Sequence, residues 1–155
     1  MTTLVQTETS LTEELTSIKT YLDTEVLAYQ GKLSWTCTVE EEVNTSLIIP
    51  KRLIRIFVEN ALSGGLIQNG NGGRIDVSAH NTSLGLLIMI NDQGIQYQDL
   101  SLIRQQRDHR LRSLDKYLEN FNEKHPYLIH YDILDRSIHD SEKLGCRILI
   151  TIQYQ

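Results

Sequence analysis

The segment that most constrains the fold of this chain is residues 50–62. Its apolar residues recur at steps of three and four positions, at Leu53, Ile56, Phe57 and Ala61. That spacing places side chains on one face of a helix. Pro50 comes first, and proline suits the first position of a helix because its missing N–H would have no partner there. The segment therefore predicts a helix that begins at Pro50 and buries one face in a core.

Asn60 lies on this predicted helix at or beside the apolar face, four residues after Ile56 and three after Phe57. An unpartnered buried amide costs roughly 1–3 kcal/mol. The Asn60 side chain is therefore either a core amide bonded to nearby backbone or a group that faces a cavity. The segment alone leaves both interpretations open.

A second informative segment, residues 84–94, begins as an apolar run and ends in Asn91, Asp92, Gln93 and Gly94. The run predicts a buried strand, and the residues after it are typical of a turn. A carboxylate at the end of a buried strand, followed by glycine, offers a ligand a fixed acceptor with the backbone close by. Taken alone, Asp92 in this place is more often a turn former.

The other segments complete an α+β pattern. Ser10 and Glu13 form a capping box, in which Glu13 is expected to reach back to the Ser10 amide at the start of an amphipathic helix ending near Gly31. A further helix is expected from Leu111 to Phe121. Strands are predicted at residues 33–39, 74–80, 84–90, 127–133 and 145–152. This order predicts a two-layer α/β sandwich, with a mixed sheet of about five strands and helices on one face.

Composition and charge narrow the class of protein. The 155 residues fit one domain. A net charge of −5 offers no basic field for nucleic acid. The sequence contains no apolar run long enough to span a membrane, and its polar first residues predict no signal peptide. Cys37 and Cys146 match no metal or redox spacing, so we expect two core thiols in a cytoplasmic, reducing location.

In chain order, the helix with Val58, Glu59, Asn60 and Ala61 and the strand ending at Asp92 resemble the ATP-binding catalytic domain of bacterial sensor histidine kinases. That fold, of the Bergerat type, is shared with type II topoisomerases, MutL-like proteins and a heat-shock chaperone family. The resemblance runs from about Ser10 onward and implies a mixed, mostly antiparallel sheet. It also implies that ATP or ADP with Mg²⁺ is the cofactor.

The resemblance assigns roles to individual residues. Glu59 would be the catalytic base or a carboxylate that orients water, and Asn60 would hold Mg²⁺ through its amide oxygen. Asp92 would accept a hydrogen bond from the adenine amino group, and Gly94 would let the base approach. Gly145 keeps the glycine of a glycine–threonine pair that contributes to cofactor binding in the relatives.

The phosphate-binding parts of the family pattern are altered. Gln96 replaces a second glycine, residues 108–111 replace a Gly-x-Gly-Leu turn that ends a mobile lid, and Cys146 replaces the threonine after Gly145. Residues 63–65 replace a basic residue that contacts phosphate. We therefore expect weak nucleotide binding that barely distinguishes ATP from ADP. Four arginines could compensate, or could form a solvated helix face: Arg104, Arg107, Arg110 and Arg112.

Three functions remain in competition. The chain could be a working or weakened kinase domain whose acceptor histidine lies elsewhere, a pseudokinase that binds no nucleotide, or a protein-binding module like the anti-sigma-factor kinases. We favour the kinase family with degraded catalysis, so whether the chain is an enzyme is left open. The expected organisation is an N-terminal helix over residues 1–31, leading from a dimerisation segment that is absent here, and an ATPase domain over residues 32–155. Expected partners are a response regulator and a second subunit through upstream helices, with any membrane attachment through an upstream region.

Overall fold

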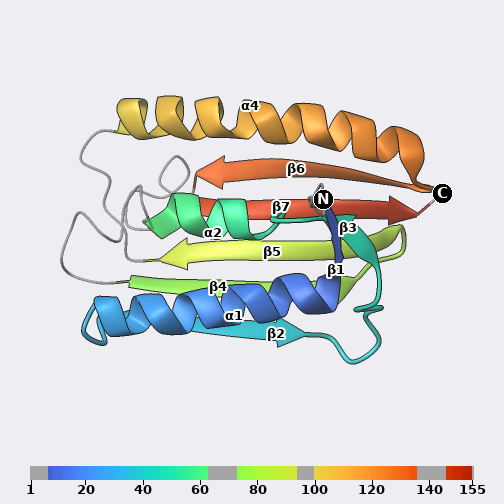
Figure 1. Cartoon of the computed structure of the whole chain (residues 1–155). Helices are drawn as coiled ribbons and strands as arrows, with labels where there is room; N and C mark the ends of the chain where they lie inside the picture. Colours follow the sequence, from blue (N-terminus) through green and yellow to red (C-terminus); the bar gives the residue numbers. More distant parts are fainter. Residues whose placement is uncertain (1–6, 63–72, 94–99, 136–145, 155) are drawn as a thin grey trace, which may run out of the picture.

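The computed structural model describes residues 7–62, 73–93, 100–135 and 146–154. Figure 1 shows how its helices and strands are arranged. In chain order these are β1 (Glu8–Ser10), α1 (Leu11–Ala28), β2 (Leu33–Val39), β3 (Ile48–Pro50), α2 (Arg55–Ala61), β4 (Gly73–Asn81), β5 (Gly85–Gln93), α4 (Leu100–Lys124), β6 (Tyr127–Asp135) and β7 (Cys146–Tyr154).

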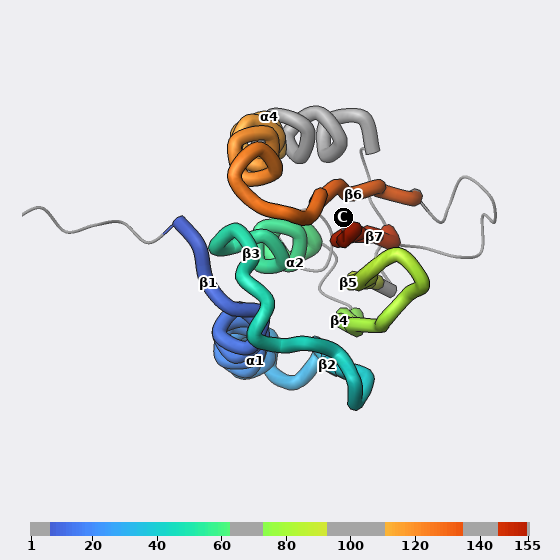
Figure 2. The backbone as a smooth tube through the Cα atoms, turned by 90° about the vertical axis from the view of Figure 1, so that its right-hand side faces the viewer, coloured from blue at the N-terminus to red at the C-terminus, as the bar shows by residue number. Residues whose placement is uncertain are grey.

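One five-stranded sheet organises the molecule, in the order β2-β4-β5-β7-β6. The β2–β4 pair is parallel, and the other three pairs are antiparallel. Helices α1, α2 and α4 all lie on the same side of this sheet, as the edge-on view in Figure 2 shows. The short strands β1 and β3 form a separate antiparallel pair. The predicted two-layer α+β sandwich, with a mixed and mostly antiparallel sheet, is therefore confirmed.

The core lies between the sheet and the helices. Strand β4 alternates as expected, with Ile75, Val77 and Ala79 buried on the helix-covered face. The apolar stripe of α1 belongs to the same cluster as the sheet residues. Burial of that stripe packs α1 against the rest of the fold. The division predicted after residue 31, between an N-terminal helix and an ATPase domain, stays a prediction. No helix in the described part of the chain is both long and apolar enough to cross a membrane.

The start of α2 differs from the prediction. Pro50 does not begin the helix: it ends β3, where it pairs with Glu8 of β1. A turn follows, with Arg52 at a φ of 71°, and the helix starts at Arg55. The reason is non-local, because pairing with β1 holds Pro50 in an extended conformation that the local sequence does not reveal.

The N-terminus of α1 is partly as predicted. Ser10 accepts a hydrogen bond from the Glu13 amide at 3.2 Å, which confirms it as the N-cap. The Glu13 side chain, however, accepts from the Thr9 hydroxyl at 2.8 Å and not from the Ser10 amide. Ser10 is also the last residue of β1, where it pairs with Ile48 of β3. The Glu13 side chain therefore does not cap the Ser10 amide as the capping box predicts.

Two further boundaries were wrong. Asn91, Asp92 and Gln93 belong to β5 and not to a turn, because β4 pairs with that strand as far as Gln93. The region that the resemblance assigns to a lid is helical from Leu100, so residues 108–111 lie inside α4. Residues 100–124 contain neither glycine nor proline, so nothing in their backbone chemistry interrupts a helix.

Candidate functional site

Glu59, Asn60 and Asp92, the predicted site residues that the structure describes, belong to elements that end at the same end of the sheet. The C-terminal end of α2, the end of β5, the start of β7 and the start of α4 all lie at the left of Figure 1. Helix α2 also contacts β5 directly. Segments of α2, β5 and β7 that are distant in the sequence therefore come together where the resemblance places the nucleotide.

Asp92 is the most constrained of the predicted residues. It faces the helix-covered side of the sheet opposite Ile75, and only 2% of it is exposed. Its Oδ1 accepts a hydrogen bond from the backbone N–H of Cys146 at 2.8 Å. A carboxylate buried this deeply requires such partners, since an unpaired buried charge is very costly. The structure therefore joins Asp92 to Cys146, which is 54 residues away in the sequence and is the neighbour of the predicted Gly145.

Asn60 lies in the last turn of α2 and is half-buried, and its Nδ2 atom is buried. Its neighbours on the helix, Phe57, Val58 and Ala61, pack into the core. Burial of the amide nitrogen agrees with the sequence-based position at or beside the apolar face.

Glu59 has partners that the sequence analysis missed. Arg52 Nη2 donates to both of its carboxylate oxygens, at 3.0 and 3.1 Å, and Arg55 Nε donates to Oε1 at 2.8 Å. A role as a base would require these ion pairs to rearrange. The Arg55–Glu59 pair has the four-residue spacing typical of helix ion pairs, so the sequence carried a signal for it.

The remaining predicted site residues lie outside the described part of the chain. These are Gly94 and Gly145, the altered residues 63–65, and the side chains of Arg104, Arg107 and Arg110. Arg112 is described, and it is exposed on α4. The roles predicted for the others stay predictions.

The described residues fit the implied cofactor in part. A carboxylate has acceptor sites on both oxygens, so Asp92 can bind an amine as well as the Cys146 amide. Mg²⁺ usually keeps several waters and takes few protein ligands, so the single oxygen of Asn60 is a sufficient protein contribution. Among the described residues, no group of three or more His, Cys, Asp or Glu side chains is arranged to hold a metal ion.

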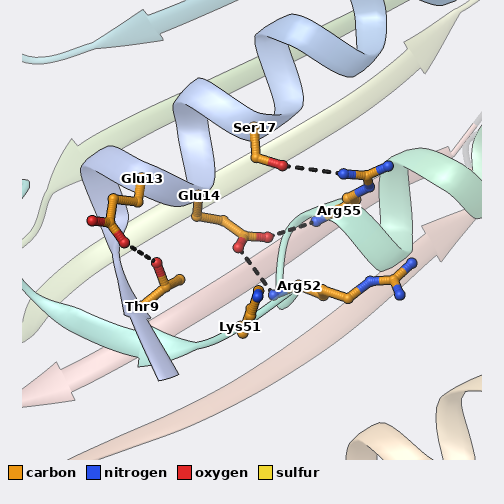
Figure 3. Close-up of a pocket in the computed structure, with 7 residues that line it drawn as sticks. All are labelled: Thr9, Glu13, Glu14, Ser17, Lys51, Arg52 and Arg55. Carbon is orange, nitrogen blue, oxygen red and sulfur yellow. Dashed lines mark hydrogen bonds between the residues drawn. The ribbon is translucent and has the colours of Figure 1, made fainter. Parts of the chain in front are cut away.

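A hollow of about 430 Å³ lies between the first turns of α1 and the start of α2, as Figure 3 shows. Its lining residues are Thr9, Glu13, Glu14, Ser17, Lys51, Arg52 and Arg55. The hollow lies at the start of α2, and two of its lining residues, Arg52 and Arg55, bond to Glu59 of the candidate site.

Comparison of sequences finds similarity to sensor kinases. No protein-family model matches the chain. Sensor protein LytS of Staphylococcus saprophyticus is 29% identical over 147 residues, which are 94% of this chain and 24% of that protein. Sensor histidine kinase/phosphatase LytS of Staphylococcus aureus is 28% identical over 116 residues, which are 73% of this chain and 20% of that protein. The chain thus spans about a quarter of the first of these relatives and a fifth of the second.

Comparison of structures finds the same fold. The catalytic domain of histidine kinase ThkA has a TM-score of 0.54 at 11% identity, with 96% of each chain covered. The histidine kinase domain of a blue-light activated kinase from Erythrobacter litoralis has a TM-score of 0.54 at 13% identity, covering 97% of this chain and 69% of that one. The cytoplasmic segment of histidine kinase QseC has a TM-score of 0.52 at 12% identity, covering 96% and 78%.

These findings define the class of protein. The chain has the fold of the ATP-binding catalytic domain of histidine kinases. Its sequence is similar, over most of its length, to the LytS sensor histidine kinases of two staphylococcal species. The resemblance predicted from the Glu59–Asn60 helix and the Asp92 strand is therefore confirmed.

Proposed function

We propose that this chain is the ATP-binding domain of a two-component sensor histidine kinase, with adenine recognition kept and phosphate handling weakened. The observation that supports this most directly is the Asp92 carboxylate. It is 2% exposed, and the Cys146 amide holds it at 2.8 Å. By the resemblance, Asp92 would be the adenine acceptor, and Cys146 stands where the relatives have the threonine of a glycine–threonine pair.

Adenine recognition follows from the chemistry of a fixed, buried acceptor. The exocyclic amine of adenine donates hydrogen bonds, and Asp92 accepts them. Guanine presents a carbonyl oxygen at the same position, which would face the carboxylate without a proton between them. A site of this kind rejects the wrong base because its own buried acceptor would be left unpaired.

Phosphate binding is the weakened part. When bound, Mg²⁺ neutralises phosphate charge, and Asn60 would supply one oxygen ligand to it. In the relatives, a glycine turn and a basic residue supply further donors, and this sequence has neither at the corresponding positions. Each missing charge-assisted hydrogen bond is worth roughly 1.5–3 kcal/mol, so we expect a dissociation constant in the high micromolar range or poorer.

The proposed partners follow from the class of protein. The structure of ThkA in complex with the response regulator TrrA has a TM-score of 0.50 to this chain at 11% identity. By analogy, the protein that contains this domain would phosphorylate a histidine elsewhere, and the phosphoryl group would pass to a response regulator. A homodimer formed through upstream helices and a cytoplasmic location belong to the same proposal.

A pseudokinase is the second candidate, and two observations favour it. Glu59 is held by Arg52 and Arg55 at 2.8–3.1 Å. Helix α4 is continuous through residues 108–111, where active relatives have a glycine turn. In this alternative the fold acts through contacts with other signalling proteins, without nucleotide turnover.

Calorimetric titration with ATP, ADP and GTP, with and without Mg²⁺, tests the proposal. We expect weak binding of both adenine nucleotides, little difference between them, and none of GTP. Asp92→Asn should abolish binding, while Asp132→Asn, at an exposed aspartate of β6, should not. Submicromolar binding that depends on Mg²⁺ and strongly prefers ATP would contradict weakened phosphate handling. No binding of any nucleotide would favour the pseudokinase.

A further inference from the structure

A cluster of polar side chains joins α1 to the segment that carries Glu59 and Asn60. We call this cluster the α1–α2 joint. It consists of Glu14, Ser17 and Tyr21 from α1, together with Arg52, Arg55 and Glu59. Figure 3 shows how four of them, Glu14, Ser17, Arg52 and Arg55, meet beside the hollow between the two helices.

Glu14 anchors the backbone at the start of α2. It is 4% exposed, and its two oxygens accept hydrogen bonds from the N–H groups of Arg52 at 3.0 Å and Arg55 at 3.2 Å. Arg52 has a φ of 71°, a conformation that residues other than glycine adopt at a cost and that persists where the surroundings hold it. Glu14 therefore fixes the turn from which α2 begins.

Arg55 connects three groups through one guanidinium. Its Nη1 donates to Ser17 Oγ at 3.1 Å, and its Nε donates to Glu59 at 2.8 Å. The same guanidinium lies 4.8 Å from the centre of the Tyr21 ring. Burial, with Glu25 and Glu59 nearby, raises the pKa of Tyr21 to about 12, so the ring stays uncharged at neutral pH. A planar guanidinium with several donors suits this position, whereas lysine has one ammonium group.

We propose that Arg55 is a positioning residue: by tying Glu59 to α1, it sets the rotation of α2 and hence the direction of the Asn60 amide. Adjacent helical residues point about 100° apart, so anchoring Glu59 determines where Asn60 points. This deepens the proposed function and rests on it for the role of Asn60 toward Mg²⁺. Asp92 is set separately, by the sheet and the Cys146 amide.

The two ends of the nucleotide site thus have different supports. The sheet holds the adenine acceptor, while α1 holds the helix that carries the proposed Mg²⁺ ligand. The hollow of about 430 Å³ beside the joint means that its side chains are not packed on every side. Core packing of Ile54, Phe57 and Val58 holds one face of α2, and the directed polar contacts of the joint hold the face toward the hollow. Disturbing them should affect the Mg²⁺ end selectively.

The test uses two variants of the joint and two controls. Arg55→Lys keeps the charge but loses the fork of donors, and Ser17→Ala removes a single hydrogen bond. Tyr21→Phe keeps the ring under the guanidinium and is the matched control. Arg74→Lys is the second control, because its ion pair with Asp76 lies at 2.8 Å on the strands of the sheet, outside the joint.

Three readouts separate positioning from general stability. Hydrogen exchange reports the opening of the α2 amides, the side-chain NH₂ resonances of Asn60 report its surroundings, and calorimetry with ADP reports affinity with and without Mg²⁺. For Arg55→Lys we expect exchange within α2 to rise roughly fivefold, the factor that corresponds to about 1 kcal/mol. The Asn60 resonances should shift and the gain in affinity from Mg²⁺ should disappear, while Mg²⁺-free affinity changes less than about twofold. Ser17→Ala should act in the same direction, and the controls should not.

Two outcomes would overturn the inference. One is an equal rise in exchange across α1, α2 and the sheet, because it would make the joint a general stabilising contact. The other is unchanged exchange and unchanged Asn60 resonances in both joint variants. Absence of nucleotide binding in the unmodified protein would reject the proposed function instead, since the exchange and resonance results still decide whether Arg55 positions α2.

Discussion

The two ends of the candidate site are built differently. At the adenine end, Asp92 and Cys146 lie on adjacent sheet strands β5 and β7, and a backbone amide holds the carboxylate. At the other end, α2 is a helix of seven residues that depends on side chains of α1 for its setting. A backbone donor survives substitution of the residue that carries it, whereas a side-chain donor does not. The contact with Asp92 therefore does not depend on which side chain position 146 carries.

Glu14→Ala should produce the largest effect, because it breaks the support of the α2 end. Removing the carboxylate leaves two backbone N–H groups without an acceptor, so we expect a loss of roughly 2–4 kcal/mol in the free energy of unfolding. Glu14→Gln keeps one acceptor oxygen and should lose about half as much. Urea denaturation measures both. A loss below about 0.5 kcal/mol for Glu14→Ala would show that α2 does not need this anchor.

Asp92→Ala breaks the adenine end and should cost less stability than Glu14→Ala. It removes the acceptor of the buried Cys146 amide, for a loss of roughly 1–3 kcal/mol. Asp92→Asn keeps an oxygen for that amide and should stay within about 1 kcal/mol of the unmodified protein. Both variants should lose adenine nucleotide binding. If Asp92→Asn bound ADP normally, the carboxylate would not be the adenine acceptor.

Asn60→Ala sharpens the comparison, since it removes the proposed Mg²⁺ ligand without removing the anchor of its helix. If the amide faces the nucleotide, the free energy of unfolding should change by less than about 1 kcal/mol. The contribution of Mg²⁺ to nucleotide affinity should disappear while Mg²⁺-free binding persists. A denaturant melt with a loss of several kcal/mol would instead identify Asn60 as a structural core amide.

The smallest effect is expected at Glu40, which is distant from both ends. Hydrogen bonds from the Asn81 amide and then from His80 lower the pKa of its carboxyl below its usual 4.5. A lowered folded-state pKa adds stability that is present above pH 4.5 and is lost as the pH falls through the folded pKa. Glu40→Gln should therefore lower the urea midpoint slightly at neutral pH, and the difference should shrink as the pH falls below 4.5. The difference should be small because Glu40 is exposed.

Much of the fold could be predicted from local patterns. The alternation of residues 74–80 placed Ile75, Val77 and Ala79 on one face, because a strand's side chains alternate whatever it pairs with. Ser10 was predictable as an N-cap because its side chain bonds to an amide only three residues away. Asp92 was predicted as a site residue, and that role stays a prediction, while its place within a strand was not predicted. Each of these signals spans only a few neighbouring residues.

The candidate site was only partly predictable. Glu59 and Asn60 were predicted as site residues from their order in the helix and stay predictions, but the two arginines that hold Glu59 were missed. The Arg55 pair has a helix spacing that could have revealed it. The ion pair between Arg52 and Glu59 could not be found from helix spacing, because Arg52 lies before α2, in a turn with a left-handed backbone conformation. Residues with no local signal escape sequence analysis even when they contact the predicted site.

The sequence by itself determined the order of the three described helices and of the five strands of the main sheet, the faces they bury and the class of protein they resemble, but not the short strands β1 and β3. The tertiary structure decided what those elements contact. Pro50 ends a strand because β1 pairs with it, and Asp92 meets the Cys146 amide because β5 and β7 are neighbours. Glu14 contacts the backbone of Arg52, at the start of α2 and 38 residues later in the sequence, because the two helices pack side by side. Periodicity depends on backbone geometry within a few residues, whereas these contacts depend on register and packing that the whole chain must establish together.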